Sequence, residues 1–257
     1  GKSLSALSIM RLLPDPPARI VGGQVKLNGR DIVPLAEETM LGIRGKEIGM
    51  IFQDPLSSLN PVATVEKQIV EVLMTHTELG RGQARVRAHE LLELVGMPDA
   101  ARRLDAYPHQ LSGGMCQRVI IAMAIACSPS VLIADEPTTA LDVTVQAQVL
   151  ALLKKLQADA GMAMIFITHD LGVVAETADR VAVMYAGRVA EIGPVREVVK
   201  HAKHPYTKGL MGSIPSLGVR TDRLTQIDGA MPRLTEIPRG CAFNPRCTLK
   251  GQRCLVE

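Results

Sequence analysis

The chain has 257 residues, of which 47% are hydrophobic and 21% are charged, with a formal net charge of +3. Such a length and apolar content favour one large folded domain, or a domain with an appendage, and exclude an intrinsically disordered chain. The small net charge and the scarcity of aromatic residues (no Trp, three Tyr, three Phe) argue against nucleic acid as the main partner.

Strands and helices are expected to alternate along the first 200 residues. The segment Gly23–Leu27 alternates apolar and polar residues before Asn28-Gly29, a hairpin-type turn signal. Helical spacing predicts helices at Gly1–Met10, Val65–Thr75, Ala84–Val95 and Val143–Ala158. Apolar runs predict buried strands at Ile48–Phe52, Val131–Ala134, Met162–Thr168 and Arg180–Tyr185. Buried strands separated by helices predict an α/β fold, with a parallel sheet covered on both faces.

The longest apolar run, Val119–Cys127, is far shorter than the roughly 20 residues needed to cross a bilayer.

The two ends of the chain differ in composition and pattern from its middle. After about residue 200, Pro, Gly and Arg become frequent and the periodicity fades, which predicts a separate C-terminal appendage. The chain opens with Gly1-Lys2-Ser3, the second half of the phosphate-binding pattern G-x-x-x-x-G-K-[ST]. The alternative is three ordinary residues, because this tripeptide occurs by chance in many chains.

The run VLIADEP, Val131–Pro137, carries two adjacent acids at the end of a predicted strand. Ligands of α/β proteins bind at this carboxyl edge of the sheet. Because neighbouring carboxylates repel, the pair needs a cation or a catalytic task. Asp135 would hold Mg²⁺ directly or through water, and Glu136 would polarise a water for attack on a phosphoryl group. The alternative is a strand end that happens to be acidic.

The stretch LSGGMCQR, Leu111–Arg118, opens the predicted helix QRVIIAMAIA. Ser112 is a good helix N-cap, and Gly113 and Gly114 allow close approach to backbone N–H groups. The free amides and the positive dipole end of such a helix suit an anion. A routine glycine-containing loop before a core helix is the alternative.

LSGGMCQR resembles the signature sequence of ATP-binding-cassette (ABC) ATPases, whose usual form is LSGGQ-x-QR. Further family motifs follow in order: IFQDP resembles the Q-loop with Gln53, TTALD resembles the D-loop ending at Asp142, and ITHD resembles the switch region with His169. The chain departs from the pattern at Met115, which replaces the usual Gln. Ser112 and both glycines are kept, so we expect a modest effect on contact with the nucleotide.

The resemblance implies an α/β P-loop NTPase fold: an ABC-type nucleotide-binding domain with a helical subdomain and a small C-terminal extension. It implies these domains: residues 1–56 and 119–200 as the two parts of the ATP-binding core, 57–118 as the helical subdomain with the signature, and 201–257 as the extension. Gly1, Lys2 and Ser3 would be the tail of a phosphate-binding loop whose front half is absent from the chain, together with a first strand and an adenine-stacking aromatic residue.

The resemblance also assigns roles around ATP and Mg²⁺. Lys2 would contact the β- and γ-phosphates, Ser3 would ligate Mg²⁺ with Asp135, and Gln53 would sense the metal and the attacking water. Glu136 would be the base, and His169 would contact the γ-phosphate. The Ser112–Gly114 amides would bind the γ-phosphate held by an opposite subunit. The implied catalytic residues are Glu136, His169 and Gln53, and the implied nucleotide-binding residues are Gly1, Lys2, Ser3, Ser112, Gly113, Gly114, Asp135 and Asp142.

Two further segments resemble the peptide and nickel importer branch of the family: DPLSSLNPVATV with YPHQLSGG, and HPYTKGLMGSIP from His204. This branch implies an ATPase at the cytoplasmic face of the cell membrane that powers uptake of oligopeptides or dipeptides. Its implied partners are a second ABC ATPase (paralogue or identical copy), membrane permease subunits and, indirectly, a substrate-binding protein, with no nucleic acid. The alternatives are a nickel importer, a soluble non-transport ABC ATPase and a regulatory cassette without turnover.

Three of the five cysteines crowd the C-terminus: Cys241, Cys247 and Cys254. An odd total that includes Cys116 and Cys127 in apolar surroundings does not suggest a disulfide framework, and it favours a reducing compartment. Three thiolates suit a soft metal or an iron–sulfur cluster, although such sites usually need four ligands. The alternatives are an iron–sulfur cluster and metal-free thiols that pack a small appendage.

Overall fold

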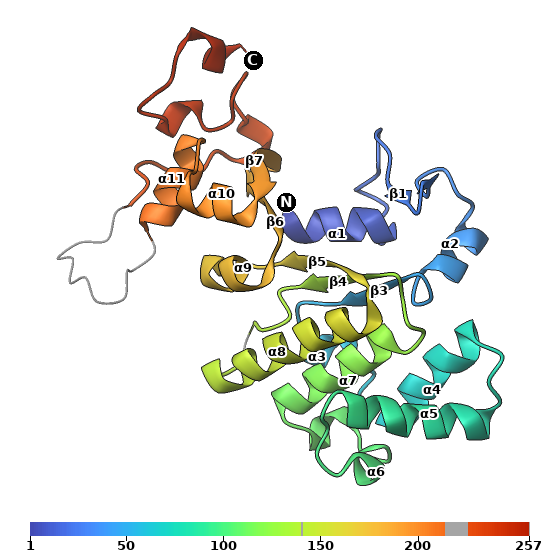
Figure 1. The fold of residues 1–257 in the computed structure, drawn as a ribbon. Coiled ribbons are helices and arrows are strands. Elements are labelled where there is room, and N and C mark those ends of the chain that lie inside the picture. The colour runs from blue at the N-terminus through green and yellow to red at the C-terminus, as the bar shows by residue number, and fades with distance from the viewer. Residues whose placement is uncertain (140, 214–225, 257) are drawn as a thin grey trace. The chain divides into compact units, whose positions relative to one another are not determined.

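The computed structural model describes residues 1–139, 141–213 and 226–256 (Figure 1). The chain divides into a larger unit, Ala6–Thr168, and a smaller unit that combines Gly1–Ser5 with His169–Glu257. The expected D-loop residue Ala140 and the end of the HPYTKGLMGSIP segment lie outside the described residues. In the parts described, no helix is long and apolar enough to cross a membrane.

Helices and short strands alternate along parts of the chain, but α3 to α7 follow one another without a strand between them. The helices are α1 (Lys2–Met10), α2 (Glu37–Ile43), α3 (Pro55–Ser58), α4 (Val65–His76), α5 (Arg81–Leu94), α6 (Ala100–Arg103), α7 (Gly113–Ile125), α8 (Val143–Ala160), α9 (Leu171–Thr177), α10 (Val195–Lys200) and α11 (Pro205–Gly212). The strands are β1 (Lys26–Leu27), β2 (Arg30–Asp31), β3 (Ile48–Ile51), β4 (Val131–Asp135), β5 (Ala163–Ile167), β6 (Arg180–Tyr185) and β7 (Arg188–Pro194). Short 3₁₀ turns lie at Pro108–Gln110, Leu234–Glu236, Asn244–Arg246 and Gln252–Leu255.

The larger unit is built on a parallel sheet of three strands in the order β3-β4-β5 (Figure 1). Successive residues of β4 point to opposite faces, as strand geometry requires. Leu132 packs in the core cluster formed with α4, α5, α7 and α8, whereas Ile133 packs in a second cluster with α1 and α2. The expected parallel sheet with both faces covered is therefore confirmed in this unit.

Local signals in the sequence explain where several helices begin and end. Thr64 accepts a hydrogen bond from the backbone N–H of Lys67 at 3.3 Å, which caps α4. Gly96 follows α5 with a φ of 70°, and Gly161 ends α8 with a φ of 60°. Left-handed φ values of this kind favour glycine, because a Cβ would crowd the following carbonyl.

Two of the expected buried strands differ from the structure. In β5, Ile167 is buried while Ile165 is 40% exposed, so this strand is only partly buried in the described structure. β6 does not join the parallel sheet. It pairs antiparallel with β7, a strand not expected from the sequence, and only Val183 and Tyr185 of β6 are buried. A run of apolar residues predicts a strand but not its partner, so the error lay in the pairing.

The smaller unit has its own apolar cluster beside the β6–β7 hairpin. Tyr185 and Phe243 are buried, and their rings meet edge to face with centroids 5.2 Å apart. Tyr206 at the start of α11 lies against both rings, at 4.7 and 5.5 Å. The guanidinium of Arg246 lies 6.0 Å from the Tyr185 ring centroid. Aromatic contacts of this kind hold the C-terminal segment to the hairpin.

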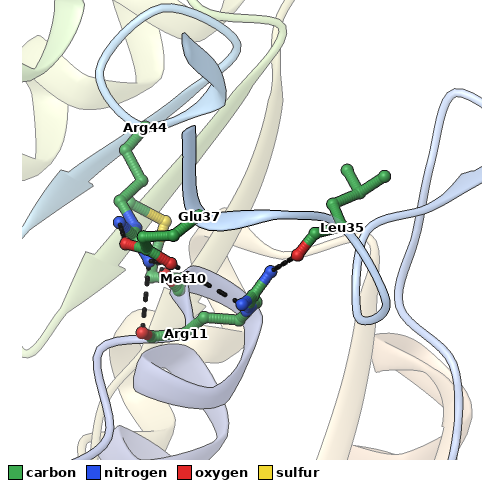
Figure 2. Close-up of polar contacts among 5 residues, drawn as sticks. All are labelled: Met10, Arg11, Leu35, Glu37 and Arg44. Atoms are coloured by element: carbon green, nitrogen blue, oxygen red, sulfur yellow. Dashed lines mark hydrogen bonds and ion pairs between the residues drawn. The ribbon is translucent and has the colours of Figure 1, made fainter. Parts of the chain in front are cut away.

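A guanidinium anchor holds the C-terminal end of α1 in the larger unit (Figure 2). Arg44 donates from Nε to the carbonyl of Met10 at 2.8 Å and from Nη2 to that of Arg11 at 3.2 Å. Arg44 also pairs with Glu37, which lies 3.6 Å from Nη2 of Arg11. The last carbonyls of a helix lack hydrogen-bond partners within the helix. Arg44 therefore supplies donors at the C-terminal end of α1, which is the negative end of the helix dipole.

Arg44→Met is expected to destabilise the protein by about 1–3 kcal/mol, because the partly buried carbonyls lose their donors. Urea unfolding of the parent and the variant measures the change. The matched control is Arg87→Met, which breaks an exposed i,i+3 pair with Glu90 on α5 and should cost at most about 0.5 kcal/mol. Equal losses in the two variants would contradict the anchor.

The same anchor predicts a dependence on pH. The hydrogen bond from Arg44 holds the pKa of Glu37 below its ordinary value of 4.5, and the charges of Arg44 and Arg11 also lower it. A lowered pKa in the folded state favours folding above pH 4.5, and this contribution is lost as the pH falls through the folded-state value. The stability gap between the parent and Arg44→Met should therefore narrow in that acidic range.

Candidate active site

The carboxyl ends of β3 and β4 meet at one edge of the parallel sheet. The register pairs Ile51 with Ala134, so the residues that follow each strand emerge side by side. Gln53 comes two residues after β3, and Glu136 directly follows β4. The sequence expectation that both residues serve one site required this juxtaposition.

Glu136 has an unusual backbone conformation, with a φ of +47°. An L-residue in the left-handed region carries a cost of roughly 1–2 kcal/mol. Two hydrogen bonds hold it there: its N–H donates to the carbonyl of Ile167 at 2.9 Å, and its own carbonyl accepts from Thr139 N–H at 3.1 Å. Strain of this kind, fixed by surrounding bonds, concentrates at functional sites.

Two donors converge on a single oxygen of the Glu136 carboxylate. Gln53 Nε2 donates to Oε2 at 3.1 Å, and the Thr139 hydroxyl donates to the same Oε2 at 3.0 Å. The sequence expectation paired Gln53 with Glu136 in one site but did not include Thr139. The missed signal is a hydroxyl three residues after the acid, because a tight turn brings the side chains of residues at this spacing together.

Asp135 is the last residue of β4 and is 4% exposed. A carboxylate at the carboxyl end of a parallel strand lies where α/β proteins bind their ligands. Mg²⁺ in nucleotide sites is held by one or two protein oxygens together with phosphates and water. Asp135 therefore fits the chemistry of a magnesium ligand. Its expected role, with Ser3 and Gln53, stays a prediction.

The expected signature segment begins α7. Ser112 is the N-cap residue, and its hydroxyl accepts from Met115 N–H at 3.4 Å. A Cβ on Gly114 would lie 2.8 Å from Cγ1 of Val145, so glycine permits the close contact with the first turn of α8. Met115, the departure from the family pattern, packs against the main core cluster. The departure therefore has a structural role on the side of α7 that faces the core.

The expected D-loop is fixed from its C-terminal side. The Asp142 carboxylate accepts from Val145 N–H at 2.9 Å and caps α8. One turn into α8, Gln146 Nε2 donates to the carbonyls of Thr138 at 3.1 Å and Leu141 at 3.0 Å. The observed role of Asp142 is thus a helix cap, and its expected contact with nucleotide stays a prediction.

Lys2, Ser3 and His169 belong to the smaller unit. The Gly1 carbonyl accepts from Ser5 N–H at 3.0 Å and from the Ser5 hydroxyl at 2.9 Å, so the tripeptide enters a regular helix, as the sequence predicts. His169 is exposed and precedes Asp170, whose carboxylate caps α9 through Gly172 N–H at 2.8 Å. The roles of these three residues toward phosphate stay predictions.

The C-terminal cysteines lie beside the aromatic cluster of the smaller unit. Cys241 Sγ is 3.9 Å from Nε2 of His204, and burial lowers the pKa of this histidine. Cys241 and Cys247 pack against that cluster. Within residues 1–139, 141–213 and 226–256, no group of three or more His, Cys, Asp or Glu side chains is placed to hold a metal ion. The structure does not gather Cys241, Cys247 and Cys254 into a ligand set.

Comparison with known families gives two matches along the chain. Residues 1–139 match the family model described as ABC transporter. Residues 190–254 match the one described as Oligopeptide/dipeptide transporter, C-terminal region.

Among curated proteins, the chain is 55% identical over 244 residues to the oligopeptide transport ATP-binding protein OppD of Bacillus subtilis, covering 95% of this chain and 68% of that protein. It is 52% identical over 247 residues to the dipeptide transport ATP-binding protein DppD of the same organism, covering 96% and 74%. Among solved structures, a dimeric post-hydrolysis state of the ATP-binding cassette MJ0796 with ADP and Pi gives a TM-score of 0.67 at 30% identity, covering 76% of this chain and 81% of that one.

Proposed function

The chain belongs to the ABC transporter family of ATP-binding cassettes, and we propose that it is the ATP-hydrolysing subunit of a membrane importer for oligopeptides or dipeptides. The protein is an ATPase with the P-loop NTPase fold of this family. The expected family, fold class and activity are thus confirmed. The observation that carries the proposed mechanism is the Glu136 carboxylate, held by Gln53 and Thr139 at the carboxyl edge of the sheet.

Glu136 is the proposed general base. Its carboxylate takes a proton from the water that attacks the γ-phosphoryl group, a transfer that needs an oriented acceptor within hydrogen-bond reach. Gln53 bonds to Glu136 directly, which supports a shared task at the attacking water. His169 is proposed to contact the γ-phosphate, as the family resemblance implies.

ATP is bound together with Mg²⁺, which neutralises phosphate charge when present. Lys2 is proposed to contact the β- and γ-phosphates as a point charge. Ser3, Asp135 and Gln53 are the proposed metal ligands, and the buried Asp135 carboxylate supports that assignment. Gly1 and Asp142 complete the proposed nucleotide contacts on this chain.

Cassettes of this family dimerise and work with transmembrane permeases. The exposed start of α7, with Ser112 and Gly113, is proposed to bind the γ-phosphate held by the second cassette. We propose the domains 1–56 with 119–200, 57–118 and 201–257, a position on the cytoplasmic face of the membrane and an indirect partnership with a substrate-binding protein. The second cassette is proposed to be a paralogue rather than an identical copy.

Peptide cargo is favoured over nickel by the C-terminal region. Residues 190–254 match the oligopeptide/dipeptide transporter extension, and OppD and DppD of Bacillus subtilis are described as oligopeptide and dipeptide transport proteins. A regulatory cassette without turnover would not need the arranged carboxylate of Glu136. A soluble cassette outside transport would not need the extension.

Transport by the assembled complex tests the cargo. The protein is reconstituted with its permeases and binding protein in proteoliposomes. Uptake of labelled di- to pentapeptides and of ⁶³Ni²⁺ is then followed in the presence of ATP. ATP-dependent peptide uptake is expected. Uptake of nickel alone would show that the cargo is nickel and not peptide. ATP hydrolysis without uptake of either would contradict the proposal that the complex is an importer.

The iron–sulfur cluster stays a hypothesis for Cys241, Cys247 and Cys254. The packing of two of these cysteines against the aromatic cluster supports the alternative of metal-free thiols. Iron analysis and a visible absorption spectrum of protein purified without oxygen distinguish the two. Colourless, iron-free protein would contradict the cluster.

A further inference from the structure

The Thr139 hydroxyl is held in a fixed place relative to Glu136. The backbone N–H of Thr139 donates to the Glu136 carbonyl at 3.1 Å, which closes a tight turn around Pro137 and Thr138. From the other side, Gln146 clamps the carbonyls of Thr138 and Leu141. Because Thr is β-branched, its χ1 angle has few accessible rotamers. The turn therefore presents the hydroxyl to Oε2 of Glu136 at 3.0 Å.

A carboxylate at the end of a Glu side chain rotates freely unless something holds it, since its last torsion has a broad profile. Hydrogen bonds to Oε2 fix that rotation and thereby fix the direction of Oε1. An efficient general base requires this orientation, because proton transfer depends on geometry before it depends on pKa.

Gln53 and Thr139 are not equivalent donors to this oxygen. Gln53 lies on the segment after β3, and its proposed tasks at the metal and the attacking water draw its amide toward the nucleotide. Thr139 lies in the same turn as Glu136 and has no such competing task. Its bond is therefore expected to remain when nucleotide and metal engage Gln53.

We propose that Thr139 is a positioning residue for ATP hydrolysis, which orients the Glu136 carboxylate through the hydroxyl bond to Oε2. This inference rests on the proposed role of Glu136 as base. It assigns to the side chain of Thr139 a contribution to kcat that is separate from nucleotide affinity. Thr139 acts through Glu136 and touches no reacting atom itself.

The test compares Thr139→Val, which keeps the shape and removes the hydroxyl, with Thr139→Ser, which keeps the hydroxyl. In the assembled transporter, Thr139→Val is expected to lower kcat about tenfold, a fraction of the total effect of a general base, with KM for ATP within about twofold of the parent. Thr139→Ser should stay within about threefold of the parental kcat. Thr144→Val, an exposed threonine on α8, is the matched control and should match the parent.

Two results would overturn the inference: a parental kcat in Thr139→Val, or equal losses in the Val and Ser variants, which would indicate packing alone. The single variant Glu136→Gln, measured beside Thr139→Val, separates this inference from its premise that Glu136 is the base. If Glu136→Gln abolishes turnover while Thr139→Val equals the parent, the base stands and the positioning role fails. If Glu136→Gln retains turnover, the base assignment and the inference both fail. Parental ATP binding in Thr139→Val, measured by fluorescent nucleotide titration, confirms that the effect lies in the catalytic step.

Discussion

Glu136→Gln is expected to lower ATP turnover of the assembled transporter at least 100-fold, since positioned general bases contribute about 10²–10⁴ in rate. Glutamine keeps the size of the side chain and an oxygen that accepts from Gln53 and Thr139, so the local packing should survive. The amide cannot take the proton of the attacking water. ATP binding should therefore remain, and the variant should accumulate with ATP bound.

Phosphate release and nucleotide binding are measured side by side for the parent, Glu136→Gln and Glu38→Gln. Glu38 is exposed on α2, so its amide variant controls for the loss of one negative charge and should hydrolyse ATP as the parent does. Asp135→Asn provides the contrast, because loss of the proposed metal ligand should weaken binding of Mg·ATP itself. Turnover within tenfold of the parent in Glu136→Gln would contradict the base.

Gly49→Ala is expected to be the most damaging glycine-to-alanine substitution in the larger unit, at about 3 kcal/mol or more. A Cβ at Gly49 would lie 2.2 Å from the backbone carbonyl oxygen of Ala124 in α7. Backbone cannot rotate away as a side chain can, so α7 or β3 must move. Because α7 begins at the signature residues and β3 leads to Gln53, the displacement should also reduce ATPase activity.

Gly42→Ala is the matched control for that substitution. Gly42 lies in α2, and apart from its chain neighbours and the backbone of its own helix no atom lies within 4 Å of the position its Cβ would take. Alanine there should be neutral or should stabilise the helix by up to about 1 kcal/mol. Urea unfolding followed by circular dichroism compares the two variants. A Gly49→Ala midpoint equal to that of Gly42→Ala would show that α7 does not press on β3.

The longer helices of the larger unit and the strands of its parallel sheet were predictable because their signals are local, whereas the short helices α2, α3 and α6 were not predicted. Periodic apolar residues, a Thr N-cap before α4 and glycines after α5 and α8 act within a few residues of the element that they begin or end. The partner of β6 was not predictable in this way. Pairing between strands is decided by contacts distant in sequence, and the apolar pattern of Arg180–Tyr185 fits either a parallel or an antiparallel partner.

In the candidate site, too, some features were predictable from the sequence and others depended on the tertiary structure. The amino-acid sequence by itself determined which chemistry is present: an acidic pair after a strand, a glycine-rich helix start and a family order of motifs that placed Gln53 and Glu136 in one site. Only the tertiary structure decided how the proposed base is held, through the left-handed backbone conformation of Glu136 and the bonds from Gln53 and Thr139. Residue type fixes what a side chain can donate or accept, but its direction depends on the meeting of β3, β4 and the loop before α8, which are far apart along the chain.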